Sequence, residues 1–323
     1  MNETTGTRGA VDPPIAAILE QINAITGLSV READPEELRA ADRQLREASP
    51  APPRIEVGSV RDAVVPGPAG DIPVRVYRPE AEGPVPTVVF FHGGGWVTGD
   101  LDSHDLVTRR ICRDVGAVVV AVHYRRAPEH PFPAAYDDCL AVALHVADHI
   151  GDDGGCPDRL AVAGDSAGAN LSAAVALAFR DRHRPLAAQL LAYPATDFDG
   201  DFPSHTENAA GYLLTREALT DFKYLYAGDD PAVRTLPQVS PLRAASHAGL
   251  APAIIGTARF DPVRDEGVAY GEALRAAGVD VFSRTYDGLI HAFLGLFPLS
   301  PAADAAFGEL CARLKQRLAD QAG

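Results

Sequence analysis

The sequence predicts an α/β protein with a mostly parallel, eight-stranded sheet that is covered by helices on both faces. After residue 86, six short and almost wholly apolar runs alternate with stretches in which apolar residues recur every three or four positions. Continuous apolar strands separated by helices are typical of parallel sheets buried on both sides. Two segments with alternating polar and apolar residues precede them and predict an antiparallel hairpin. With 323 residues, 46% of them hydrophobic, the chain can bury a sizeable core as one large domain or two small ones.

The first fifty residues predict two helices before the sheet begins. Apolar residues recur at helical spacing over Pro14–Ile25 and Pro35–Ala48, and the proline-rich run Ser49–Pro53 then breaks the pattern. The hairpin is predicted at Ile55–Val64 and Ile72–Tyr77. The six further strands are predicted at Thr87–Phe91, Ala117–His123, Leu160–Gly164, Leu186–Ala192, Ala253–Thr257 and Val279–Thr285. The helices that cover them are predicted at Ser103–Val115, Ala134–Ile150, Ala167–Arg182, Asp265–Ala277 and Ala302–Ala319.

Residues 197–251 interrupt this alternation. They contain no run typical of a buried strand, but they are rich in aromatic residues: Phe198, Phe202, Tyr212, Phe222, Tyr224 and Tyr226. An insertion of this length beside a sheet is usually functional, so we expect a helical cap that also includes the N-terminal helices. The alternative is an extra packing layer in which the aromatic side chains only form the core. The predicted division is 1–50 for the N-terminal part of the cap, 51–196 for the first part of the α/β core, 197–251 for the cap insertion and 252–323 for the second part of the core.

Composition limits the partners and the compartment that we expect. The formal net charge is −15, with 44 acidic against 29 basic residues, which disfavours nucleic acids and anionic membranes as partners. No run of about 18 apolar residues predicts a membrane span, and no secretory signal precedes the first helix. The four cysteines, Cys112, Cys139, Cys156 and Cys311, are far apart and predict neither a zinc site nor a disulfide framework. We expect a cytoplasmic protein.

A Gly-x-Ser-x-Gly turn lies between a predicted strand and a predicted helix. The strand Leu160–Gly164 is followed by Asp165, Ser166, Ala167 and Gly168, and then by an alanine-rich helical stretch. In this order a serine occupies a turn too tight for side chains two positions before and after it, and its hydroxyl is exposed at the C-terminal edge of the sheet. Backbone N–H groups and the helix dipole favour developing negative charge there. We predict that Ser166 is a nucleophile; the alternative is a serine that caps a helix.

A serine nucleophile needs a base, and chain order selects one histidine. In this architecture the acid and then the histidine follow the serine, each after a later strand. Three histidines follow Ser166 in a suitable region, but His205 lies in the predicted cap and His247 precedes the next strand. His291 lies in the loop after Val279–Thr285, so we predict that it is the base. The alternative is an ordinary surface histidine.

The acid that orients the histidine is expected after the preceding strand. Asp261 follows Ala253–Thr257 and would hold the imidazole in the productive tautomer. Asp265 and Glu266 are rivals further from the end of the strand. Asp265 is better explained as the N-cap of the following helix, which makes it the second choice for the acid.

The donors for an oxyanion are expected from a glycine-rich loop after another strand. The strand Thr87–Phe91 leads into His92, three glycines and Trp96. Consecutive glycines let backbone N–H groups approach a substrate without a Cβ atom in the way. The amide of Ala167 would supply a further donor from the serine turn. The alternative for the glycines is a flexible turn without a ligand.

Five blocks of the chain resemble the hormone-sensitive-lipase-like family of α/β-hydrolases, also called bacterial family IV. They are HGGGW at His92–Trp96, YRRAPEHPFPAA at Tyr124–Ala135, GDSAG at Gly164–Gly168, DPVRDE at Asp261–Glu266 and HAF at His291–Phe293. The resemblance covers about residues 75–295 in the family's order and spacing. It implies a carboxylic-ester hydrolase with a helical cap. By position it gives the triad roles to Ser166, Asp261 and His291, and the oxyanion donors to Gly94, Gly95 and Ala167.

The departures from the family pattern remove no reactive group. The family more often has Gly where this chain has Ala292, and Leu where it has Arg126 and Val263. The substrate pocket is predicted to include Trp96, Tyr124, Tyr212 and Leu213. Tyr124 and Glu129 are expected to shape its floor, and Asn170 is expected to be structural.

The predicted reaction is hydrolysis of small, short-acyl esters through an acyl-enzyme on Ser166, without metal or organic cofactor. An amide or peptide hydrolase with the same triad is the alternative, because triad chemistry alone does not distinguish the leaving groups. A receptor on the same fold, like a plant hormone receptor that resembles this family but lacks the histidine, is disfavoured because His291 is present. The strand Val279–Thr285 is expected at an exposed sheet edge, where a homodimer could form.

Overall fold

Eight strands form one sheet at the centre of the computed structural model, which describes residues 9–23, 29–48 and 54–320. Their order across the sheet is β1-β2-β4-β3-β5-β6-β7-β8. The strands are β1 (Ser59–Gly67), β2 (Gly70–Arg78), β3 (Val85–Phe91), β4 (Val118–Val122), β5 (Gly155–Asp165), β6 (Ala188–Ala192), β7 (Ala253–Phe260) and β8 (Val281–Ile290). β2 is antiparallel to both of its neighbours, and the remaining pairs are parallel. The predicted α/β class and the mostly parallel eight-stranded sheet are therefore confirmed.

The apolar content of the strands explains why the sheet is buried. Every residue of β4 and of β6 is buried, as expected for parallel strands covered on both faces. The hairpin strand β1 is mostly exposed and lies at one edge of the sheet, with β8 at the other. The first strand begins at Ser59, not at Ile55 as predicted, because pairing in the hairpin runs from Ser59 opposite Arg78 to Gly67 opposite Gly70.

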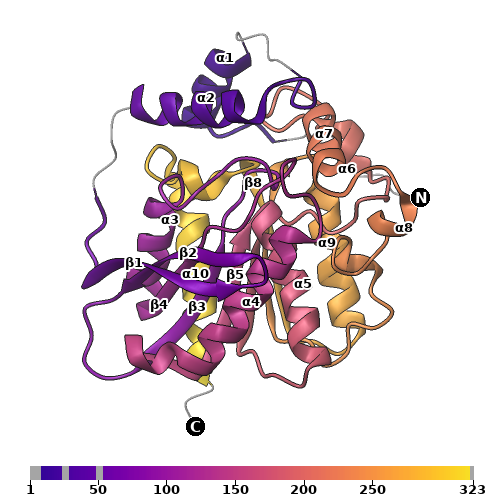
Figure 1. Ribbon diagram of the computed structural model, residues 1–323. Coiled ribbons are helices and arrows are strands. Elements are labelled where there is room, and N and C mark those ends of the chain that lie inside the picture. Colours follow the sequence, from indigo (N-terminus) through magenta and orange to yellow (C-terminus); the bar gives the residue numbers. More distant parts are fainter. Residues whose placement is uncertain (1–8, 24–28, 49–53, 321–323) are drawn as a thin grey trace.

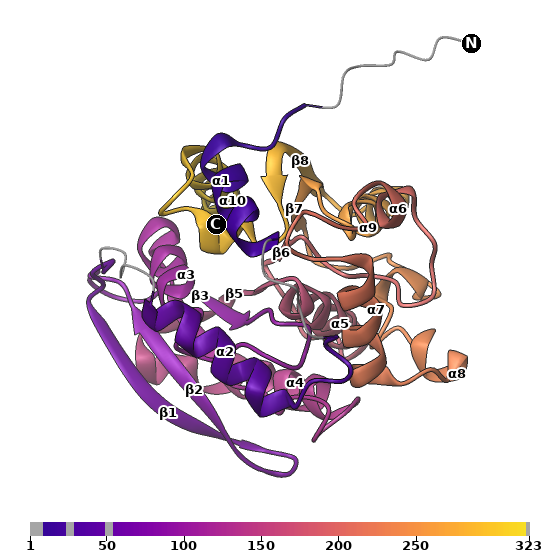
Figure 2. The same ribbon diagram turned by 90° about the horizontal axis from the view of Figure 1, so that it is seen from above.

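Helices cover both faces of the sheet (Figures 1 and 2). The pair α3 and α10 packs on one face, and α4, α5 and α9 pack on the other. Their bounds are α3 (Asp105–Ile111), α4 (Ala134–His149), α5 (Ala167–Asp181), α9 (Arg264–Ala276) and α10 (Pro301–Asp320). The helix predicted from Ser103 begins two residues later and ends in a π-helical turn, Cys112–Gly116. Ser103 itself lies in a closed turn with Asp100, which keeps it outside the helix.

A second group of helices lies at the top of Figure 1 and along its right-hand side. It consists of α1 (Pro13–Asn23), α2 (Pro35–Ala48), α6 (Pro203–Glu207), α7 (Arg216–Ala227) and α8 (Pro231–Arg234). α2 is tied to the core by Arg39, which donates to the carbonyl oxygens of Val97 and Ala127 and pairs with Glu129 at 2.7 Å. The predicted helix end at Ala24 and Ile25, and the predicted breaker Ser49–Pro53, lie outside the described residues. In the described ranges, no helix combines the length and apolar character needed to cross a membrane.

A buried ionic cluster centred on Glu266 joins residues 197–251 to α9. Glu266 is fully buried, and its carboxylate accepts hydrogen bonds from His205 and Lys223, both at 2.9 Å. The backbone N–H groups of Thr196 and Asp197 also donate to it. Burial would raise the pKa of Glu266, but the attraction of Lys223 and the hydrogen bond from His205 hold that pKa below its ordinary value. We call these four partners and Glu266 the Glu266 cluster.

Candidate active site

Ser166 occupies a strained turn between β5 and α5. Its φ angle is +52°, a conformation that costs free energy for a residue with a side chain. The turn is possible because glycines flank it at close approach. A Cβ atom at Gly168 would lie 1.9 Å from the carbonyl oxygen of Phe91, and one at Gly164 would lie 2.4 Å from the backbone of Gly168. The backbone N–H of Ser166 donates to the carbonyl oxygen of Ala192 at 2.9 Å, which fixes the turn to β6.

His291 and Asp261 meet Ser166 in one hydrogen-bonded chain. The Nε2 atom of His291 lies 2.8 Å from the Ser166 Oγ, and its Nδ1 lies 2.8 Å from the Asp261 Oδ2. Asp261 is 0% exposed, and its other carboxylate oxygen accepts a hydrogen bond from the N–H of Val263. His291 follows its strand directly, because β8 continues to Ile290 and not only to the predicted Thr285. The three side chains predicted from chain order are thus brought together.

The rival residues have other partners. His205 bonds to Glu266, and the Nε2 of His247 lies 3.0 Å from the carbonyl oxygen of Pro241. The carboxylate of Asp265 accepts from the N–H of Ser204 and pairs with Arg264. The prediction that Asp265 is an N-cap is wrong: Val263 holds that position, and α9 begins at Arg264. Asp265 instead lies in the first turn, where a negative charge complements the helix dipole.

The glycine loop after β3 has the backbone conformation that its sequence requires. Gly94 has φ +109° and Gly95 has φ +60°, both in the region that favours glycine. A Cβ atom at Gly94 would lie 2.5 Å from the carbonyl oxygen of Thr98. The carbonyl oxygen of Gly94 accepts from the N–H groups of Val97 and Thr98, which closes the loop. We call residues 92–99 the glycine loop.

Below the glycine loop, Asp165 connects several chain segments. Its Oδ1 accepts a hydrogen bond from the N–H of Gly93 at 2.9 Å and lies 3.2 Å from the Nε2 of His104. The hydroxyl of Tyr193 donates to its Oδ2 at 3.4 Å. Tyr193 has φ +40°, and its ring packs edge-on against His291 with 4.8 Å between the centroids. His104 and Tyr193 are not among the residues predicted from sequence, and Asp165 is predicted only as a member of the GDSAG block.

A cavity of about 260 Å³ lies beside these residues. Its lining includes Gly94, Asp165, Tyr193, the residue after His291 (Ala292), and Asp42 from α2. The cavity therefore borders the glycine loop, the residue before Ser166 and the residue after His291, and α2 bounds it on one side; the side chains of Ser166, Asp261 and His291 are not part of its lining.

The four residues predicted to line a pocket have different surroundings. Trp96 is buried and stacks on Tyr226 with 4.7 Å between the ring centroids. Its ring is therefore part of the packing between the glycine loop and α7. Tyr124 is also buried, and its hydroxyl donates to the carbonyl oxygen of His92 at 2.7 Å. Tyr212 is half-buried against Phe260. Leu213 is 39% exposed.

Asn170, predicted to be structural, and Glu129, predicted to shape the floor of the pocket, both connect distant segments of the chain. The side-chain amide of Asn170 donates to the carbonyl oxygens of Ala195 and Val239, at 2.7 and 2.8 Å, which joins α5 to the segment just before the insertion and to its second half. Glu129 pairs with Arg39 of α2, and this contact lowers the pKa of Glu129 to about 2.

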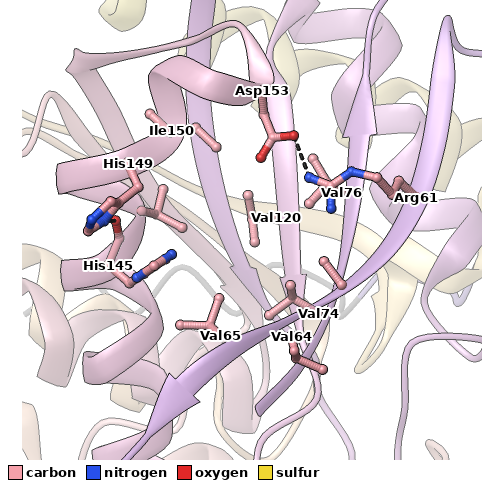
Figure 3. Close-up of a pocket in the computed structure, with 12 residues that line it drawn as sticks. Arg61, Val64, Val65, Val74, Val76, Val120, His145, His149, Ile150 and Asp153 are labelled. Atoms are coloured by element: carbon pink, nitrogen blue, oxygen red, sulfur yellow. Dashed lines mark hydrogen bonds and ion pairs between the residues drawn. The ribbon is translucent and has the colours of Figure 1, made fainter. Parts of the chain in front are cut away.

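Another hollow lies between the hairpin and α4 (Figure 3). Valine side chains form much of its wall, the stacked imidazoles of His145 and His149 lie on one side, and the ion pair of Arg61 with Asp153 lies on the other. All of its lining residues belong to β1, β2, β4, α4 and the turn after α4. It is therefore separate from the segments that carry Ser166, Asp261 and His291.

Comparison with known proteins gives a consistent result. Residues 88–295 match the model of a family described by the alpha/beta hydrolase fold. The carboxylic ester hydrolase LipN of Mycobacterium tuberculosis is 44% identical over 317 residues, which cover 95% of this chain and 83% of LipN. The ethyl acetate hydrolase of Pseudomonas putida is 35% identical over 324 residues, covering 96% of this chain and 100% of that protein. The crystal structure of a thermostable esterase from Pseudomonas putida superposes with a TM-score of 0.91 at 36% identity, covering 97% of this chain and 99% of the other.

Proposed function

Because the chain belongs to the hormone-sensitive-lipase-like family of α/β-hydrolases and is a carboxylic ester hydrolase, we propose that Ser166, His291 and Asp261 are its catalytic triad. The observation that carries the proposal is the unbroken hydrogen-bonded chain from the Ser166 Oγ through His291 to Asp261, with 2.8 Å at each step. These distances are within the range over which a base activates a serine hydroxyl.

In the proposed reaction, the Ser166 Oγ attacks the ester carbonyl carbon while the Nε2 of His291 takes the hydroxyl proton. Asp261 holds the imidazole in the correct tautomer and stabilises the imidazolium that forms. The negative charge on the carbonyl oxygen is stabilised by the backbone N–H groups of Gly94, Gly95 and Ala167. His291 then protonates the departing alcohol, and a water molecule activated by the same imidazole hydrolyses the acyl-enzyme.

We propose small esters with short acyl chains as the substrates. The support is the cavity that borders Gly94 and Ala292, whose volume of about 260 Å³ is enough for a small acyl or alcohol group next to the glycine loop. The name of the relative from Pseudomonas putida, an ethyl acetate hydrolase, is in keeping with this size. α1 and α2 together with residues 197–251 are proposed to be the cap over this cavity, since Asp42 of α2 lines it and Phe222 of α7 touches Gly95.

Two further proposals concern assembly and location. β8 lies at the edge of the sheet, and an edge strand can pair with the same strand of a second copy, so we propose a homodimer through β8. Sedimentation velocity tests this: a monomer at micromolar concentration would contradict it. A cytoplasmic location is supported by the four cysteines, all of them free thiols as is usual in a reducing compartment.

The test of the proposed function is hydrolysis of a p-nitrophenyl ester series from acetate to palmitate by the wild-type protein and by Ser166→Ala. We expect turnover that falls steeply as the acyl chain lengthens, and a loss of turnover of at least about 10⁴-fold in Ser166→Ala. The matching p-nitroanilides test amide hydrolysis. Turnover that persists in Ser166→Ala would overturn the mechanism, and comparable rates on anilides would overturn the ester preference.

A further inference from the structure

His104 lies beneath the glycine loop, between Ser103 and Asp165. Its Nε2 atom is 3.2 Å from the Oδ1 of Asp165, and its Nδ1 atom is 2.8 Å from the Oγ of Ser103. Asp165 immediately precedes the nucleophile, and the same Oδ1 atom accepts the hydrogen bond from the N–H of Gly93. His104 thus contacts Asp165, and Asp165 in turn accepts a hydrogen bond from Gly93, the residue before Gly94.

The hydrogen bonds around Ser103 accommodate a doubly protonated His104. The Ser103 hydroxyl accepts from the Asp100 N–H at 2.8 Å, and its oxygen lies 2.9 Å from the carbonyl oxygen of Asp100 and 2.8 Å from the Nδ1 of His104. When the hydroxyl hydrogen goes to the Asp100 carbonyl, Nδ1 donates to the hydroxyl oxygen. The carboxylate of Asp165 only accepts, so the Nε2 of His104 donates to it. In this arrangement both ring nitrogens carry a hydrogen, and the ring is an imidazolium.

We propose that His104 is a positioning residue of the oxyanion hole: its imidazolium holds the Asp165 carboxylate, which fixes the N–H of Gly93 and thereby the donors Gly94 and Gly95. The inference rests on the proposed function for the role of those donors. The ion pair itself does not depend on that function. A hydrogen bond between charged partners is shorter and stronger than a neutral one, so loss of the imidazolium loosens the hold on the loop.

The charged and titratable groups that face His104 favour this protonation state. Burial would lower the pKa of His104, but the Asp165 carboxylate, with Asp100 and Asp42 further away, holds the pKa above its ordinary value. The ring of His92 lies 5.6 Å from that of His104. Burial, followed by repulsion from His104, lowers the pKa of His92 to about 3, so His92 is neutral. The Nδ1–H of His92 donates to the carbonyl oxygen of Gly93 at 2.8 Å. Of the two neighbouring histidines, His104 is therefore the one that keeps its proton to higher pH.

Burial would raise the pKa of Asp165, but its attraction to His104 and the Gly93 amide hold that pKa below its usual range. The ion pair is therefore lost on the alkaline side, as the pH rises through the raised pKa of His104. Because the donors act on the oxyanion, this loss should reduce kcat more than it changes KM. A residue that only supports folding would not produce such a pH dependence.

The first test is an NMR titration of protein labelled with ¹³C in its histidine rings, with the His104 signal assigned by its disappearance in His104→Gln. We expect a pKa above 6.5 for His104 in the wild-type protein and a lower value in Asp165→Asn, which removes the counter-charge. A wild-type His104 that titrates at or below 6.5 would overturn the proposal. This readout does not require turnover, so it is independent of the proposed function.

The second test is a pH profile of kcat and KM on p-nitrophenyl acetate, with kcat expressed per site titrated by a fluorophosphonate. His104→Gln keeps a donor toward Asp165 without the charge. Relative to the wild-type protein, we expect a kcat about 10-fold or more lower, a KM within about twofold, and no decline of kcat at alkaline pH from His104.

His149→Gln on α4 is the matched control and should keep the wild-type pH profile. Equal kcat per site and an unchanged alkaline limb in His104→Gln would contradict the positioning role, whereas no turnover in the wild-type protein would contradict the proposed function alone.

Discussion

Phe222 of α7 lies so close to Gly95 that a Cβ atom at that glycine would be 2.4 Å from the Cδ1 atom of the phenylalanine ring. The helix α7, which lies within residues 197–251, therefore packs directly against the glycine loop, which is proposed to stabilise the oxyanion. Trp96, the next residue, stacks on Tyr226 of the same helix with nearly parallel rings. The position of the glycine loop thus depends on side chains more than one hundred residues later in the chain.

Replacing Gly95 by alanine should lower kcat by about 10²- to 10³-fold, because the methyl group collides with Phe222 and displaces an oxyanion donor. The double variant Gly95→Ala/Phe222→Ala should recover part of the loss, since it removes the collision but leaves the unfavourable φ of +60°. Steady-state kinetics on p-nitrophenyl acetate measures both. Gly278→Ala is the control, because Gly278 has φ +80° in open space; it should reduce stability and leave kcat unchanged. A wild-type kcat in Gly95→Ala would contradict the assignment of this loop.

The two acids after β7 should differ sharply in their effect on turnover. Asp261→Asn should lower kcat by about 10⁴-fold, because an amide no longer holds His291 in the productive tautomer. Asp265→Asn should leave kcat near the wild-type value and lower the free energy of unfolding by about 1 kcal/mol. The reason is that the Asp265 carboxylate accepts a hydrogen bond from the Ser204 N–H and complements the helix dipole in the first turn of α9. The comparison is made in kcat/KM and in urea unfolding. A larger kinetic loss in Asp265→Asn would reverse the assignment.

Lys223→Met should destabilise the protein, because it leaves the fully buried Glu266 without its cationic partner. We expect the free energy of unfolding to fall by about 3–5 kcal/mol, the range for breaking a buried ion pair. Arg284→Met removes one partner of the more exposed pair with Glu309 and should cost less than about 1 kcal/mol. Urea unfolding followed by circular dichroism compares the two. Equal decreases in unfolding free energy for Lys223→Met and Arg284→Met would show that burial does not make the ion pair of Lys223 with Glu266 more important for stability than the exposed pair.

The Glu266 cluster should also make stability depend on pH in the acid range. The pKa of Glu266 is lowered in the folded state, so the unfolded chain binds a proton at this group more readily. The stabilisation is fully present above the ordinary pKa of a glutamate and is lost as the pH falls through the folded value. The difference in unfolding free energy between the wild-type protein and Glu266→Gln should therefore be constant from pH 7 to about pH 5 and shrink below. A difference that grows on acidification would have the wrong sign.

The parts of the molecule that were predictable from sequence are those in which a local pattern determines the outcome. The buried strands follow from continuous apolar runs, and the turn at Ser166 follows from glycines that must approach Phe91 and each other closely. Chain order then selects Asp261 and His291, because each comes just after its strand. In these cases the physical constraint lies within a few residues of the motif.

The residues that sequence reasoning missed or misplaced depend on partners that are distant in the chain. His104 falls in a helical pattern, and only the fold brings it to Asp165. Trp96 is predicted to line the pocket, but its ring is buried against Tyr226. Tyr193 is an ordinary residue after a strand until its strained backbone places its ring against His291. Local periodicity does not contain these contacts.

The order of the strands has a consequence for how activity arises during folding. The glycine loop, Ser166, Tyr193, Asp261 and His291 follow β3, β5, β6, β7 and β8, which are consecutive neighbours across the sheet. With the proposed triad, a nascent or truncated chain that lacks β8 has no base beside Ser166, however much of the remaining core it has formed. Ester hydrolysis is thus a late reporter of assembly: in a refolding experiment it should appear with the docking of the last strand, after the helical signal has recovered.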